Sequence, residues 1–127
     1  MRLLLDTSAV LHLAAGTLPP AAADALRSGG LAVLSPVVPW ELAIKVKAGK
    51  LELPRPPLDY CMSLARRHRL TLPREGLDAM LLCAAAELPL IHRDPFDRIL
   101  VATAIREQLA VLTPDRAIAL YPVATMW

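Results

Sequence analysis

The chain has 127 residues, of which 55% are hydrophobic and 20% are charged. This composition supports one buried core and excludes a disordered chain. Fourteen lysines and arginines oppose twelve aspartates and glutamates, so the net charge of +2 is too small for a protein that coats nucleic acid by charge alone. Five aromatic residues are also too few for an extended surface on which successive bases stack.

Short apolar runs alternate with helical segments along the chain. Strands are predicted at residues 3–5, 31–34, 110–112 and 123–126, with another short apolar run at 70–72. Helices are predicted at residues 8–15, 20–28, 36–48, 58–67, 77–87 and 95–108. This alternation predicts an α/β fold, a three-layer α/β/α sandwich with a central, mostly parallel sheet, as a single domain over residues 1–127. Ligands of such sheets bind beyond the carboxyl ends of the strands.

Two acidic residues follow predicted strands. Asp6 comes directly after the first strand, and Asp115 comes three residues after the strand at 110–112. Each also has a structural interpretation, because Asp6 can cap the next helix and Asp115 can complement a helix dipole.

Glu41 lies in the most apolar sector of its predicted helix, between residues such as Val38 and Ile44. Its carboxylate is therefore expected to point inward. The competing interpretation is an ion pair with Lys45, one turn later on the same face. An exposed pair of this kind contributes a few tenths of a kcal/mol, whereas removing a charge from water costs several, so the pair alone explains the placement poorly.

Asp97 is a second inward acid, near the centre of the apolar stripe that includes Leu100 and Val101. The alternative is a capping box with Asp94 as N-cap, although such boxes usually use the longer Glu or Gln.

These four acids come from four separate segments and can converge on one edge of the sheet. Carboxylates crowded in a partly dry cleft stay ionised when cations neutralise them, and oxygen ligands favour Mg²⁺ or Mn²⁺. Such ions polarise a phosphodiester and turn bound water into hydroxide. The pattern therefore predicts metal-assisted phosphodiester hydrolysis.

The remaining polar residues give weaker signals. His92 shows no metal-ligand spacing, and a structural role is favoured for it. Cys61 and Cys83 are predicted to be small core residues. Four cations lie within four residues of a candidate ligand and can either hold phosphates or pair with the acids: Lys45, Arg93, Arg98 and Arg116.

Four motifs together resemble a known family. They are L-L-L-D-T-S at 3–8, W-E-L-A-I-K at 40–45, H-R-D-P-F-D-R at 92–98 and L-T-P-D at 112–115. In order and spacing they resemble the PIN domain of VapC-type toxins, over nearly the whole chain. The first motif is weak, but the second followed by the third is specific.

The resemblance implies a PIN-like fold and an Mg²⁺- or Mn²⁺-dependent endoribonuclease, the toxin of a toxin–antitoxin pair. Such a protein is expected to be a homodimer that binds an antitoxin, in some cases as a larger heteromer, and RNA. Independently, the chain has no clear signal-peptide pattern and no apolar stretch of eighteen residues, which predicts a cytoplasmic location and no membrane contact. The residues that match the family's acidic quartet are Asp6, Glu41, Asp97 and Asp115, with Asp94 as an additional acid. The hydroxyl positions that match the same cleft are Thr7, Ser8 and Thr113.

Two other functions are weighed. A phosphoacceptor signalling domain also carries acids at strand ends, but this chain lacks the acidic pair before the phosphorylated Asp and the late-strand Lys. A non-catalytic module that binds RNA or a protein partner would keep the acids for structure alone.

Overall fold

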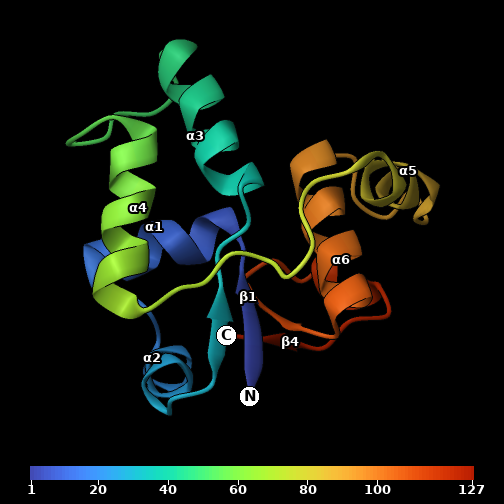
Figure 1. Cartoon of the computed structure of the whole chain (residues 1–127), viewed down its shortest axis with the longest axis horizontal. Helices are drawn as coiled ribbons and strands as arrows, with labels where there is room; N and C mark the ends of the chain where they lie inside the picture. The colour runs from blue at the N-terminus through green and yellow to red at the C-terminus, as the bar shows by residue number, and fades with distance from the viewer.

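A four-stranded parallel sheet forms the centre of the computed structural model, which describes residues 1–127 (Figure 1). Its strands are β1 (Arg2–Leu5), β2 (Leu31–Val33), β3 (Ala110–Leu112) and β4 (Thr125–Met126). They are arranged in the order β2-β1-β3-β4, and each pair of neighbours is parallel. The predicted α/β fold with a central sheet is therefore confirmed, and the sheet is parallel throughout.

Six helices and one 3₁₀ turn connect the strands. They are α1 (Thr7–Ala15), α2 (Pro20–Arg27), α3 (Val37–Lys47), α4 (Pro57–His68), α5 (Ala79–Glu87), α6 (Pro95–Glu107) and η1 (Ile118–Leu120). The chain steps from β1 to β2 through α1 and α2, then back past β1 to β3 through α3 to α6. Because parallel crossovers are almost always right-handed, these two opposite steps cover opposite faces of the sheet and produce three layers.

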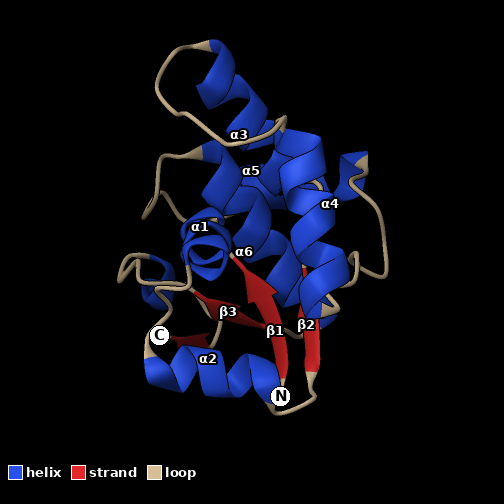
Figure 2. Cartoon of the chain, turned by 90° about the vertical axis from the view of Figure 1, so that its left-hand side faces the viewer, coloured by secondary structure: helices blue, strands red, loops and turns tan.

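The strands point toward the end of the molecule from which α3 projects (Figure 2). Leu4 and Leu5 of β1 and Val111 and Leu112 of β3 are completely buried, as expected for parallel strands covered on both faces. The strand order reverses at β1, which has β2 on one side and β3 on the other. Such a reversal opens a crevice at the carboxyl ends of the strands, where Asp6 and the residues after β3 lie.

The apolar run at 70–72 forms one parallel bridge, from Thr71 to Val33, and Leu72 is exposed. Two local predictions need correction. The last strand is two residues shorter than predicted, because the Val123 N–H bonds to the Tyr121 carbonyl in a turn.

The second correction concerns the cysteines. Cys61 is buried as predicted, but Cys83 is exposed. Cys83 belongs to α5, which lies at one end of the molecule and packs chiefly on α6 (Figure 1).

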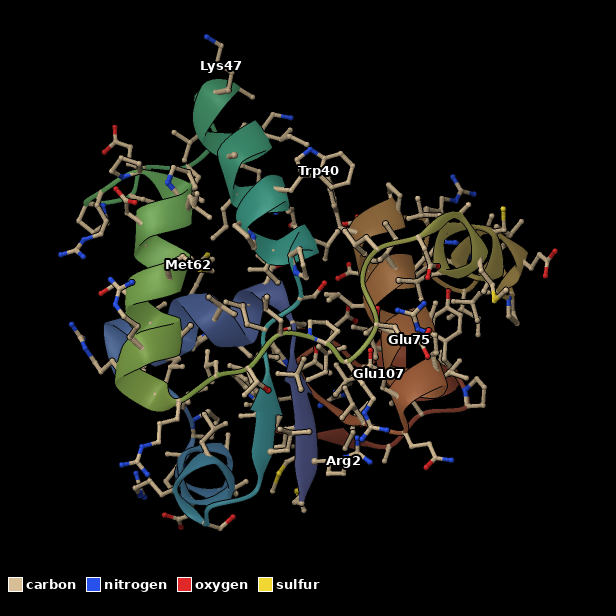
Figure 3. The ribbon with its side chains drawn as sticks, in the orientation of Figure 1. Arg2, Trp40, Lys47, Met62, Glu75 and Glu107 are labelled. Carbon is tan, nitrogen blue, oxygen red and sulfur yellow. The ribbon has the colours of Figure 1, made fainter.

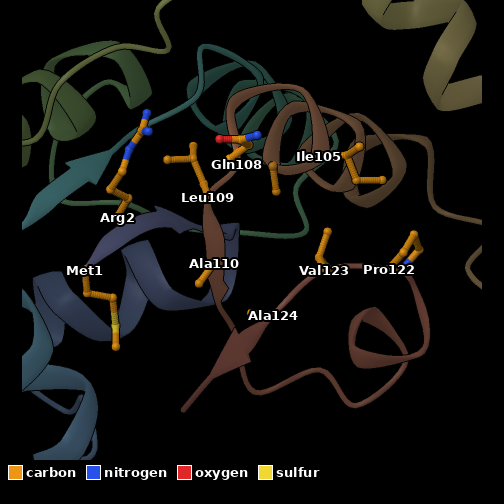
Figure 4. Close-up of a pocket in the computed structure, with 10 residues that line it drawn as sticks. Met1, Arg2, Ile105, Gln108, Leu109, Ala110, Pro122, Val123 and Ala124 are labelled. Atoms are coloured by element: carbon orange, nitrogen blue, oxygen red, sulfur yellow. The ribbon is translucent and has the colours of Figure 1, made fainter.

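A hollow of about 510 Å³ lies at the opposite edge of the sheet from the acids, around Met1 and Ala110 (Figure 4). Its lining is mostly apolar, with Ile105 and Val123 on one side, and none of the candidate acids faces it. The longest helix, α6, has 13 residues, and none of the helices could span a lipid bilayer.

Candidate metal centre

A pocket of about 350 Å³ lies at the carboxyl edge of the sheet. Its lining is almost entirely polar: Asp6, Thr7, Ser8, Leu11, Glu41, Lys45, Asp94, Asp97, Pro114 and Asp115. The acids come from the ends of β1 and β3, from α3, and from the start of α6. The structure thus brings together the acids that the sequence carries in four separate segments.

Asp6 lies at the base of this pocket and is 3% exposed. It is the N-cap of α1, where its Oδ1 accepts a hydrogen bond from the Ala9 N–H at 2.7 Å. Its Oδ2 accepts from the hydroxyl of Thr113, which follows β3. Burial raises the pKa of Asp6, and the Thr113 hydrogen bond opposes this effect. The capping role is therefore real, and Asp6 also lines the pocket with both of its oxygens hydrogen-bonded.

Glu41 is held by two donors. The Thr7 hydroxyl donates to Oε1 and the Lys45 ammonium donates to Oε2, each at 2.6 Å. The side chain of Glu41 is 4% exposed, whereas that of Lys45 is 46% exposed. The hydrogen bond to Glu41 raises the pKa of Lys45. The ion pair considered from the sequence is present, and it neutralises an acid that faces the pocket.

The two acids at the start of α6 have different roles. Asp94 is the N-cap, and its Oδ1 accepts from the Phe96 N–H at 2.9 Å. Asp97 takes no part in a capping box, because the Asp94 N–H donates to Nδ1 of His92 at 3.3 Å. Burial, followed by the negative charge of Asp94, raises the pKa of Asp97 to about 7. A bound cation would relieve this crowding.

His92 is the residue that the sequence did not assign to the site. Its Nε2 lies 3.1 Å from Oδ2 of Asp97 and 2.8 Å from Oδ2 of Asp115. One donor atom from each of these three residues lies within 4.8 Å of the others. The available signal was its position in H-R-D-P-F-D-R, directly before α6, but no regular spacing links it to Asp115.

The predicted substrate-binding residues divide into three groups. Thr7, Ser8 and Lys45 line the pocket, and Thr113 is buried beneath it against Asp6. Arg116 is exposed outside the lining.

Arg98 is different, because its side chain is 6% exposed and bonds to the backbone of the segment before α6. These bonds occupy its guanidinium, and Arg98 does not belong to the pocket lining, so the structure gives no support to its predicted contact with substrate phosphate.

The helices that carry Glu41 and Asp97 touch through an aromatic pair. Trp40 extends from α3 toward α6 (Figure 3), and its ring lies 5.0 Å from that of Phe96 in an edge-to-face contact of 77°. Pairs of this geometry are favourable beyond the area they bury. The contact connects the two helices beside the pocket.

The donor set fits a hard divalent cation. Five carboxylates line the pocket and no thiol does. Burial is the main cause of the raised pKa values of Asp6 and Asp97, and the neighbouring carboxylates raise both further. Carboxylate oxygens of this kind are the ligands preferred by Mg²⁺ and Mn²⁺.

Comparisons with known proteins agree with this architecture. A family model described as PIN domain matches residues 3–123. A chain of VapBC2 from Rickettsia felis, solved bound to a DNA fragment from its promoter, superposes with a TM-score of 0.70 at 16% identity, covering 99% of this chain and 98% of that one.

Two further solved structures are similar. A chain of FitAB bound to an IR36 DNA fragment gives a TM-score of 0.61 at 17% identity over 98% of this chain and 93% of that one. A chain of FitAcB from Neisseria gonorrhoeae gives a TM-score of 0.59 at 19% identity, covering 98% of this chain and 96% of that one. A search of curated proteins found no match.

Proposed function

We propose, because this chain belongs to the PIN domain family, that it is a metal-dependent endoribonuclease and the toxin component of a toxin–antitoxin pair. The observation that carries the proposal is the convergence of five carboxylates from four segments on one open pocket. A structural function would not require so many like charges to share a partly buried site, because their repulsion opposes folding.

Each pocket residue has a role in this proposal. Asp6, Glu41, Asp97 and Asp115 would hold Mg²⁺ or Mn²⁺, with Asp94 as a further acid. The bound ions would polarise the scissile phosphodiester and supply hydroxide for in-line attack. Thr7 and Lys45 orient Glu41. Thr113 orients Asp6 in the same way. Lys45 is half exposed and would meet the phosphate backbone of RNA from the rim, with Ser8 beside it.

The similar structures support an antitoxin partner. The VapBC2 chain was solved with a DNA fragment from its promoter and the FitAB chain with an IR36 DNA fragment, which supports a partner protein that links this kind of chain to DNA. We therefore include a cognate antitoxin in the proposal. A homodimer of this chain and a cytoplasmic location are also part of it, on the ground of the sequence alone. The single nuclease domain would cover residues 1–127.

Cleavage of RNA by the purified chain tests the proposal. We expect Mn²⁺ or Mg²⁺ to be required, and EDTA to stop the reaction. Asp6→Asn should abolish cleavage while circular dichroism shows an intact fold, because the amide removes a charged ligand. Asp59→Asn is the matched control, since this exposed acid lies in the first turn of α4.

Two outcomes would contradict the nuclease proposal. If Asp6→Asn cleaves RNA as well as the wild type, or if the folded protein binds RNA without cleaving it at any metal concentration, the nuclease proposal fails. The second outcome would favour the non-catalytic binding module.

A further inference from the structure

The segment between α5 and α6 is held by one buried side chain. The guanidinium of Arg98 donates to the carbonyl oxygens of Ala86 at 2.9 Å, Leu88 at 2.7 Å, Pro89 at 2.9 Å and His92 at 3.2 Å. Ala86 lies in the last turn of α5, and the other three residues lie outside any helix or strand. The planar fork of an arginine can serve several acceptors at once, so Arg98 determines the path of the backbone here.

Tyr121 holds the same segment from the C-terminal side. Its hydroxyl accepts from the His92 N–H at 2.8 Å and donates to the Pro89 carbonyl at 3.0 Å. It also lies 3.5 Å from the Arg98 guanidinium, and the residue is 3% exposed. The peptide groups of His92 are therefore fixed on both sides, through the N–H by Tyr121 and through the carbonyl by Arg98.

The imidazole of His92 then has a defined orientation. The Asp94 N–H can only donate, so Nδ1 is the acceptor in their 3.3 Å contact. The ring proton consequently lies on Nε2, which faces Asp97 and Asp115. In this tautomer Nε2 donates to the two carboxylates and has no lone pair to offer a metal ion.

We propose that His92 is a positioning residue for the acidic pocket, whose Nε2–H holds the carboxylates of Asp97 and Asp115 in place, with Arg98 and Tyr121 as its support. This inference rests on the metal site of the proposed function. Groups that hydrogen-bond to metal ligands orient them, and losing one typically weakens metal binding 10- to 100-fold. Arg98 directly follows Asp97 in the chain, and its side chain turns away from the pocket to hold the segment that carries His92.

Calorimetric titration with Mn²⁺ alone tests the inference. His92→Ala should weaken Mn²⁺ binding about 10- to 100-fold. His92→Gln keeps an N–H donor at a similar reach, so it should stay within about threefold of the wild type. Equal loss in the Gln and Ala variants would overturn the inference, because it would make the imidazole itself a ligand. Unchanged binding by His92→Ala would also overturn it.

The support is tested by Tyr121→Phe, which removes one hydroxyl and keeps the buried ring. We expect weaker Mn²⁺ binding in this variant, and no further weakening when it is combined with His92→Ala, because Tyr121 acts through His92. Additive losses in the double variant would refute the support role. Tyr60→Phe, in α4, is the matched control and should bind Mn²⁺ normally.

The result for the wild type separates the two proposals. Binding by the wild type with no effect of either His92 variant would refute this inference and leave the metal site intact. A folded wild type that does not bind Mn²⁺ would refute the metal site of the proposed function and the inference with it.

Discussion

Replacing Asp97 with asparagine should stabilise the metal-free protein while abolishing its response to metal. The carboxyl group has an ordinary pKa of 3.8 and a pKa of about 7 in the folded chain, so it releases its proton at a lower pH when the chain unfolds. The folded state therefore binds more protons between pH 4 and 7, and the stability of the wild type decreases as the pH increases through this range.

The size of this effect follows from the two pKa values. Their difference corresponds to about 4 kcal/mol at pH 8. Water reaches the open pocket and screens the charge, so we expect a measured gain of about 1 to 2 kcal/mol in Asp97→Asn. For a chain of this length that is about 4 to 8 °C in melting temperature. At pH 4 the two proteins should differ much less.

Urea unfolding in EDTA at pH 4 and pH 8, followed by melting curves with and without Mn²⁺, measures both effects. Asp59→Asn serves as the control for loss of an exposed carboxylate. The reasoning is refuted if Asp97→Asn is no more stable than the wild type at pH 8 without metal. The assignment of Asp97 as a ligand is refuted if Mn²⁺ raises the melting temperature of the variant as much as that of the wild type.

Three further predictions concern single residues. Lys45→Met should lower the free energy of unfolding by about 1 to 2 kcal/mol in urea without metal, because buried Glu41 loses its cationic partner. Lys47→Met, on the same helix, should leave this free energy nearly unchanged. Burial raises the pKa of Cys61 to about 11, so the folded chain keeps its thiol proton to a higher pH than the unfolded chain. The free energy of unfolding should therefore decrease by up to about 1.4 kcal/mol per pH unit from pH 9 to 11. The same measurement on Cys61→Ala should lack this contribution. Gly30→Ala should lower the free energy of unfolding by about 1 to 3 kcal/mol, measured by thermal melting, since its Cβ would lie 2.0 Å from the Met1 carbonyl oxygen. Gly76→Ala is the control and should melt like the wild type, because a Cβ there would meet no atom within 4 Å.

The sequence alone determined most of the fold, because its signals are local. Continuous apolar runs predict doubly buried strands, and the prolines and glycines between them mark the ends of helices. The segment at 70–72 was harder to predict, because its pairing depends on how far the end of α4 lies from β2. The inward direction of Asp97 was also predictable, since the stripe that it shares with Leu100 and Val101 is buried. For Glu41 the pattern was only partly right, because Val38 is buried whereas Ile44 of the same sector is 43% exposed.

The tertiary structure alone decided the surroundings of the acids. The interactions of His92 with Asp115 and Tyr121 span 23 and 29 residues, and no periodic pattern connects positions so far apart. For the same reason the sequence placed Arg98 among the phosphate-binding residues, because proximity along the chain does not show that a guanidinium turns back to a loop. A helix or strand repeats its direction from residue to residue, whereas hydrogen bonds between loops depend on where the whole chain has folded.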